Sequence, residues 1–137
     1  MSNPLNSWLA LPVVVLGLVL PVAAAVAQTP KAPARAAVQV EQGASLYRQH
    51  CVLCHGAEGR GGQGFPRPIW GAGHDLAKFG TARGLLEYMQ LLMPFDNPQK
   101  MTDAEKLAVV AYMLARNGNW KAEAALEPAQ AGSVAVK

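Results

Sequence analysis

The sequence of 137 residues contains only two cysteines, Cys51 and Cys54. Two thiols cannot form a four-cysteine zinc site, so that class of metal site is excluded. Charged residues are also scarce, at 15% of the chain with a net charge of +3, and they form no dense basic stripe of the kind that binds nucleic acid. No segment alternates polar and apolar residues convincingly as a half-buried strand does, which favours an all-α fold.

The first 27 residues contain no aspartate, glutamate, lysine or arginine. Residues 9–27 are apolar and end in Ala25-Val26-Ala27, which is typical of a signal-peptide cleavage site. We therefore expect residues 1–27 to be a signal peptide and the protein to be periplasmic. The alternative is that residues 9–27 stay in place as a membrane anchor, because a spanning helix needs roughly 17 to 25 residues. Pro12 and Pro21 weaken this alternative.

The rest of the chain divides into three parts by composition. Residues 28–37 are rich in proline and alanine and predict an extended tether. Residues 38–120 carry the apolar periodicity of one small folded domain. Residues 121–137 are rich in alanine, with Pro128 and Gly132, and predict a flexible tail.

Three segments of the folded part have the apolar spacing of helices. Thr81 is placed to cap the second helix and Pro94 to stop it, while a capping box at residues 102–105 opens the third helix and Asn117-Gly118 closes it. The repeating positions are Val40, Gly43, Ala44, Tyr47 and Cys51 in the first segment, Leu85, Tyr88, Met89 and Leu92 in the second, and Leu107, Val110, Ala111 and Leu114 in the third.

Residues 56–80, between the first two helices, form a long stretch rich in glycine that also contains Pro66 and Pro68. A loop of this length inside a compact domain is unusual. It becomes reasonable if the loop wraps a bound cofactor.

Cys51-Val52-Leu53-Cys54-His55 is the strongest motif in the sequence, because C-x-x-C-H is the attachment site of c-type haem. Cys51 and Cys54 would form thioethers with the two vinyl groups of one porphyrin, and His55 would be the proximal iron ligand. The alternatives are a disulfide, a thiol redox pair or half of a zinc site. The motif histidine, the export signal and the long loop all favour haem.

Several side chains could supply the second axial ligand of the iron. Met93 is the best placed, because it lies at the end of the second helix and is followed by Pro94. Met101, in a loop, is the main rival, and His74 would give a bis-histidine centre. Met89 and Met113 lie on apolar stripes, where packing is the usual role. We expect His50 to be a surface residue that points away from the iron.

The segment from Gly43 to Tyr47, followed by the Cys51 to His55 motif, resembles the first helix of the class I c-type cytochromes, and residues 109–114 resemble their C-terminal helix. The resemblance covers residues 40–118. It implies that these two helices cross closely at Gly43, with Tyr47 and Tyr112 packed around the crossing. It also implies three main helices and a long loop around one covalent haem, with a His/Met iron.

Within that superfamily, residues 93–105 are similar to the Met-Pro segment of periplasmic cytochromes that work with dehydrogenases, among them partners of quinoprotein alcohol dehydrogenases and of sulfite dehydrogenases. The family's proline, whose carbonyl accepts a hydrogen bond from the proximal histidine, corresponds to Pro66 or Pro68. Three aromatic residues are expected to line the porphyrin or to belong to the core: Trp70, Phe79 and Phe95.

These features predict a one-electron carrier rather than an enzyme. Its expected partners are a redox donor and acceptor, such as a dehydrogenase, a cytochrome complex or a terminal oxidase. The alternatives are a membrane-anchored subunit of a redox complex and, as a weaker hypothesis, a haem peroxidase or gas sensor. Candidate steering charges for docking are Arg60, Arg67, Lys78, Arg83 and Lys100.

Overall fold

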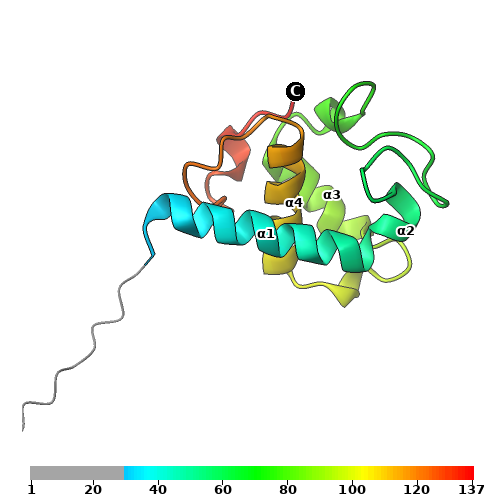
Figure 1. Cartoon of the computed structure of the whole chain (residues 1–137), viewed down its shortest axis with the longest axis horizontal. Helices are drawn as coiled ribbons and strands as arrows, with labels where there is room; N and C mark the ends of the chain where they lie inside the picture. The colour runs from blue at the N-terminus through cyan, green and yellow to red at the C-terminus, as the bar shows by residue number, and fades with distance from the viewer. Residues whose placement is uncertain (1–29) are drawn as a thin grey trace, which may run out of the picture.

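Helices and connecting loops make up residues 30–137, the part of the chain that the computed structural model describes (Figure 1). The signal peptide or anchor expected at residues 1–27 lies outside the described residues. No helix in residues 30–137 combines the length and apolar character needed to cross a membrane. The elements in order are α1 (Ala32–His50), α2 (Val52–His55), the 3-10 helix η1 (Leu76–Phe79), α3 (Ala82–Leu92), the 3-10 helix η2 (Pro98–Lys100), α4 (Asp103–Arg116) and the 3-10 helix η3 (Ala131–Ser133).

Helices α1 and α4 cross at Gly43, and this crossing organises the domain (Figure 1). A side-chain carbon at Gly43 would lie 2.0 Å from the carbonyl oxygen of Ala108, so only glycine allows the two backbones to come this close. Beside the crossing, the Tyr47 ring lies 5.6 Å from the Tyr112 ring and 5.0 Å from the Trp70 ring. The close crossing and the packing of both tyrosines are confirmed.

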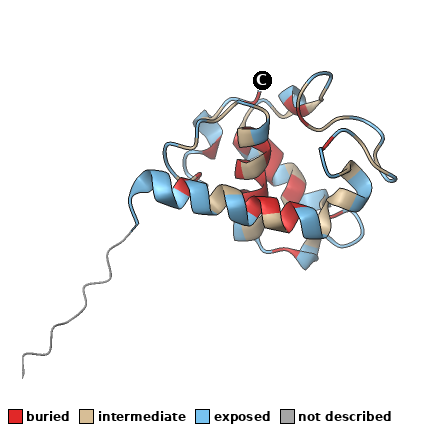
Figure 2. Cartoon of the chain, viewed as in Figure 1, coloured by how far each residue is buried: buried red, intermediate tan, exposed pale blue. Residues whose placement is uncertain are grey.

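The predicted boundaries of α3 and α4 are also confirmed. The Thr81 side chain accepts a hydrogen bond from the Gly84 N–H, and α3 ends at Leu92, directly before Met93 and Pro94. Thr102 and Glu105 form the expected capping box at the start of α4. Figure 2 shows that the buried residues gather where α1, α3 and α4 face one another.

The prediction of an extended tether at residues 28–37 is wrong for residues 32–37, because α1 already begins at Ala32. Pro33 lies in the first turn, where the N–H that proline lacks has no helical partner in any case. Alanine is the strongest helix former, so the alanine residues that follow extend the helix. Ala36 is fully buried, which gives this extension a packing contact.

The tail expected at residues 121–137 is packed against the domain instead of being loose. Leu126 and Val136 belong to the core, with exposed fractions of 1% and 5%. The Gln39 side chain forms two hydrogen bonds with the backbone of Leu126, at 2.9 and 2.7 Å. The Ala82 N–H bonds to the Val134 carbonyl at 2.8 Å, which joins the tail to the start of α3.

Candidate functional site

The last four residues of the C-x-x-C-H motif form the short helix α2, and Cys51 lies between the end of α1 and the start of α2. The carbonyl groups at the end of such a helix lack helical partners, and here the following loop supplies N–H donors. The Leu53, Cys54 and His55 carbonyls accept hydrogen bonds from Gln63, Phe65 and Gly61 at 3.2, 3.0 and 3.1 Å. The loop therefore holds the motif in one conformation.

Glycine is required where this loop lies against the motif. A side-chain carbon at Gly64 would lie 2.7 Å from the Cys54 sulfur, and one at Gly56 would lie 2.4 Å from the Gly61 carbonyl oxygen. Gly56 also has φ +75°, a left-handed conformation that glycine adopts without strain. The Tyr47 hydroxyl donates to the Gly56 carbonyl at 2.7 Å, which ties the loop to α1.

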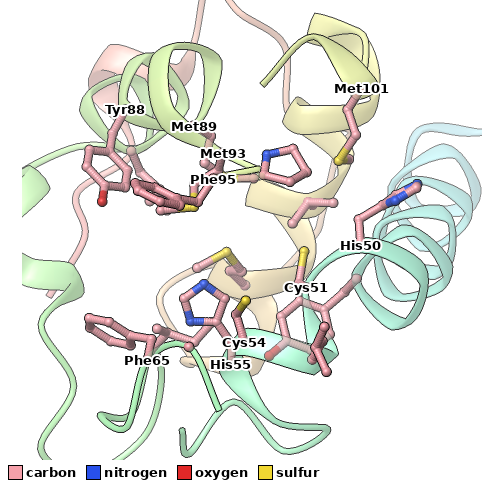
Figure 3. Close-up of a pocket in the computed structure, with 18 of the residues that line it drawn as sticks. His50, Cys51, Cys54, His55, Phe65, Tyr88, Met89, Met93, Phe95 and Met101 are labelled. Atoms are coloured by element: carbon pink, nitrogen blue, oxygen red, sulfur yellow. The ribbon is translucent and has the colours of Figure 1, made fainter. Parts of the chain in front are cut away.

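A cavity of about 740 Å³ opens above the motif, within the range of roughly 300 to 1,000 Å³ for cofactor and ligand sites. His55, Cys51 and Cys54 form one wall, and α3 and the segment that follows it form the opposite wall (Figure 3). The lining is largely apolar, which suits a porphyrin. The loop contributes Gly64, Phe65, Pro68 and Ile69, and η1 contributes Leu76 and Phe79.

His55 is half-buried at the base of the cavity, and its Nδ1 atom is buried without a hydrogen-bond partner. Burial lowers the pKa of His55, because the charged imidazolium loses hydration. A neutral imidazole with a free lone pair is the form that ligates a metal. Neither the Pro66 nor the Pro68 carbonyl accepts a hydrogen bond from His55 here, and Pro68, unlike Pro66, lines the cavity.

Cys51 and Cys54 are free thiols in this structure and form no disulfide with each other. Burial, with a smaller contribution from the neighbouring Cys54, raises the pKa of the Cys51 thiol to about 12. A redox-active cysteine has a lowered pKa, because the thiolate is its reactive form. The environment of Cys51 therefore disfavours the thiol redox pair that the sequence left open.

Four methionines line the same cavity: Met89, Met93, Met101 and Met113. Met89, Met101 and Met113 are core residues with exposed fractions of 5%, 4% and 6%. Met93 is half-buried and lies in extended backbone immediately after α3. In Figure 3, Met89 and Met93 lie across the cavity from His55, whereas Met101 lies farther along the wall, toward His50.

The other two histidines differ in their relation to the cavity. His74 does not line it, and its Nδ1 atom accepts the Leu76 N–H at 3.0 Å, which disfavours the bis-histidine alternative. The expectation that His50 is a surface residue is wrong in part. It is half-buried and lines the cavity, with Nδ1 buried and unpartnered. His50 is the last residue of α1, where the chain turns toward the motif.

The three aromatic residues expected at the porphyrin or in the core divide between those two places. Phe79 and Phe95 line the cavity, and Phe95 is 82% exposed at its edge. Trp70 is 4% exposed and belongs to the core, where its ring meets the Tyr112 ring edge-on.

Two of the five candidate steering charges, Lys78 and Lys100, line the cavity. Lys100 lies 4.0 Å from Asp96, and Arg67 lies 3.1 Å from Asp75. Arg83 donates to the Pro128 carbonyl at 3.2 Å, which connects it to the tail. The two ion pairs, Lys100 with Asp96 and Arg67 with Asp75, lie at the surface, where such pairs contribute little to stability.

Residues 38–113 match the family described as "Cytochrome C oxidase, cbb3-type, subunit III". The chain belongs to this family of c-type cytochrome domains. The resemblance to class I c-type cytochromes is thereby confirmed, as is the expectation of a covalently bound haem c, with which the pair Cys51 and Cys54 is consistent. No curated protein matches this cytochrome in sequence.

A solved structure supports the same fold. The cytochrome superposes on a chain of the "Sulfane Dehydrogenase SoxCD from Paracoccus pantotrophus" with a TM-score of 0.56 and 22% sequence identity. The match covers 71% of this chain and 52% of that chain, so the cytochrome spans about half of the solved neighbour. The small all-α cytochrome c fold that the sequence predicted is confirmed.

Proposed function

We propose that this cytochrome is a periplasmic one-electron carrier in which His55 and Met93 are the axial ligands of the haem iron. When bound, haem c supplies an iron that accepts and releases one electron. Electron transfer itself follows from the cytochrome c domain. The ligand pair, the compartment and the identity of the partners are the proposed parts.

The placement of His55 and Met93 on facing walls of one apolar cavity is the observation that carries the proposal (Figure 3). A neutral imidazole and a neutral thioether are both ligands that would hold a haem iron. The thioether is a soft ligand that favours ferrous over ferric iron, and the apolar lining acts in the same direction. If His55 and Met93 both hold the iron, no position would be left for a substrate, and the site would favour electron transfer over substrate binding.

Three features favour Met93 over Met101 as the ligand. Met93 leaves α3 in extended backbone, so its side chain is not committed to a helical stripe. It lies across from His55 in Figure 3. Met101 is 4% exposed and packs in the core, where a methionine usually fills space.

The partners are proposed from chemistry and from the comparisons. A dehydrogenase is the proposed donor, in line with the resemblance of residues 93–105 and with the solved neighbour, which is itself a sulfane dehydrogenase. A terminal oxidase or a cytochrome complex is the proposed acceptor.

The second candidate is a fixed subunit of a redox complex, and the family description, which names an oxidase subunit, favours it. This subunit would keep residues 9–27 as an anchor. The intact mass of the purified protein separates the two candidates. A carrier with a cleaved leader starts after Ala27, and an anchored subunit starts at Met1.

Replacement of Met93 by alanine tests the ligand assignment, with Met101→Ala as the matched control. We expect Met93→Ala to lose the weak far-red sulfur-to-iron band of the ferric protein and to have a lower reduction potential. Met101→Ala should keep the band. A band that survives in Met93→Ala and disappears in Met101→Ala would make Met101 the ligand. A wild-type ferric spectrum that is high-spin, with carbon monoxide binding to the reduced form, would replace the carrier with a gas sensor or peroxidase.

A further inference from the structure

Lys106 is the one charged residue among residues 30–137 whose side chain is buried, with an exposed fraction of 2%. It lies in the first turns of α4, and its Nζ donates a hydrogen bond to the Gln90 carbonyl at 3.1 Å. Burial of an ammonium group is costly unless that group is paired. None of the ion pairs in residues 30–137 includes Lys106, so its partner lies at the end of α3.

The Gln90 carbonyl needs such a donor because of the Met93-Pro94 sequence. In an α-helix the carbonyl of one residue accepts the N–H of the residue four positions later. The Met89 carbonyl accepts the Met93 N–H at 3.0 Å. The next donor in the ladder would be residue 94, which is proline and has no N–H. Lys106 supplies the missing donor from the neighbouring helix.

The charge of Lys106 also suits this position. The carbonyl groups at the C-terminus of a helix carry a partial negative charge, and a cation there is stabilising. Gln90 lies in the last turn of α3, three residues before Met93. The Lys106 side chain is therefore bonded to the turn that directly precedes Met93. Lys106 does not itself line the cavity.

We propose that Lys106 is a positioning residue for the methionine ligand, acting through the Gln90 carbonyl to hold the end of α3. This inference rests on the proposed ligation by Met93. Without Lys106 the Gln90 carbonyl would be left without a donor, and the last turn of α3 would loosen. Met93 would then be held less firmly and would be displaced more easily by another ligand.

The test is a titration of the haem-loaded ferric protein with imidazole, which competes with the methionine for the iron. We expect Lys106→Leu to bind imidazole about tenfold more tightly than the wild type, which corresponds to about 1.4 kcal/mol. The far-red band should weaken in the same variant. Lys106→Arg, which keeps both the donor and the charge, should restore wild-type behaviour. Lys121→Leu removes the same charge from an exposed site beyond α4 and should change neither readout.

The outcomes separate this inference from the proposed ligation. A wild-type protein without the far-red band refutes the ligation by methionine. A wild-type protein with the band, together with an unchanged imidazole affinity in Lys106→Leu, overturns the role of Lys106 alone. An unchanged imidazole affinity overturns the role of Lys106 even if the reduction potential of Lys106→Leu falls. Loss of a buried charge changes the potential without any movement of Met93. If Lys106→Leu loads no haem, Lys106→Met takes its place, because methionine is of similar length and has no N–H donor, and an unchanged affinity in that variant overturns the inference equally.

Discussion

Replacement of Gly43 by alanine should destabilise the domain, although alanine is the better helix former. In an open helix the change would stabilise by about 1 kcal/mol. At Gly43 the added carbon would lie 2.0 Å from the Ala108 carbonyl oxygen and 2.8 Å from the Tyr112 Cβ. Carbon and oxygen normally approach to about 3.3 to 3.6 Å. Rotation of a side chain cannot relieve the contact with Ala108, because that contact is with backbone.

Relief of this contact needs about 1.3 to 1.6 Å of separation, and a gap between α1 and α4 of even 0.5 to 1 Å forfeits roughly a quarter to a half of the dispersion energy across the contact. Overpacking of this kind costs about 1 to 3 kcal/mol. With the backbone as the obstacle, we expect a net loss of about 2 kcal/mol in the free energy of unfolding.

Guanidinium unfolding of the haem-loaded protein, followed by circular dichroism, measures this change. Gln42→Ala is the matched control, because Gln42 is the exposed neighbour of Gly43 in α1 and should change stability by no more than about 0.5 kcal/mol. A Gly43→Ala variant that is as stable as the wild type, or more stable, would show that the crossing does not depend on glycine.

Two further predictions concern residues that do not line the cavity. Leu126 is a tail residue that is 1% exposed, and Leu126→Ala should lower the free energy of unfolding by about 2 to 5 kcal/mol. The control Leu91→Ala, at a residue that is 74% exposed, should lower it far less. Equal losses in denaturant unfolding would contradict a tail that packs on the domain. Thr102→Ala should cost about 1 kcal/mol through loss of the cap on α4. The Thr102 backbone N–H, followed by its hydroxyl, lowers the pKa of Glu105 from 4.5. The part of the capping box that the ionised Glu105 side chain supplies is therefore present above pH 4.5 and is lost as the pH falls through the lowered value. Unfolding curves over that acid range should show a weaker pH dependence in Thr102→Ala than in the wild type, and parallel curves would rule this interpretation out.

The helices that surround the cavity could be predicted because their signals are local. Thr81 and the Thr102 to Glu105 box mark helix starts through hydrogen bonds that span three residues, and such contacts can be recognised from spacing alone. The C-x-x-C-H motif likewise carries its chemistry in five consecutive residues.

Long-range contacts account for what the sequence could not reveal. The tail lacks apolar periodicity, and it is held by pairs such as Gln39 with Leu126, which are 87 residues apart. The start of α1 differs from the prediction because proline-rich composition indicates a tether, whereas the first turn of a helix tolerates a proline such as Pro33.

Lys106 is the clearest case of a residue that the sequence concealed. A lysine at this position of the sequence could equally be an exposed surface residue. The group that Lys106 bonds to, the Gln90 carbonyl, lies on another helix. The missing N–H of Pro94 was visible in the sequence, but the side chain that replaces it could be found only in the structure.

The central claim is that one haem is joined covalently to Cys51 and Cys54. Intact mass spectrometry of the purified protein, made in a host that attaches haem c, tests it most directly. We predict a mass that exceeds the polypeptide by one haem and that returns to the bare polypeptide when both cysteines are replaced by alanine. A colourless wild-type protein with the mass of the polypeptide alone would contradict the claim.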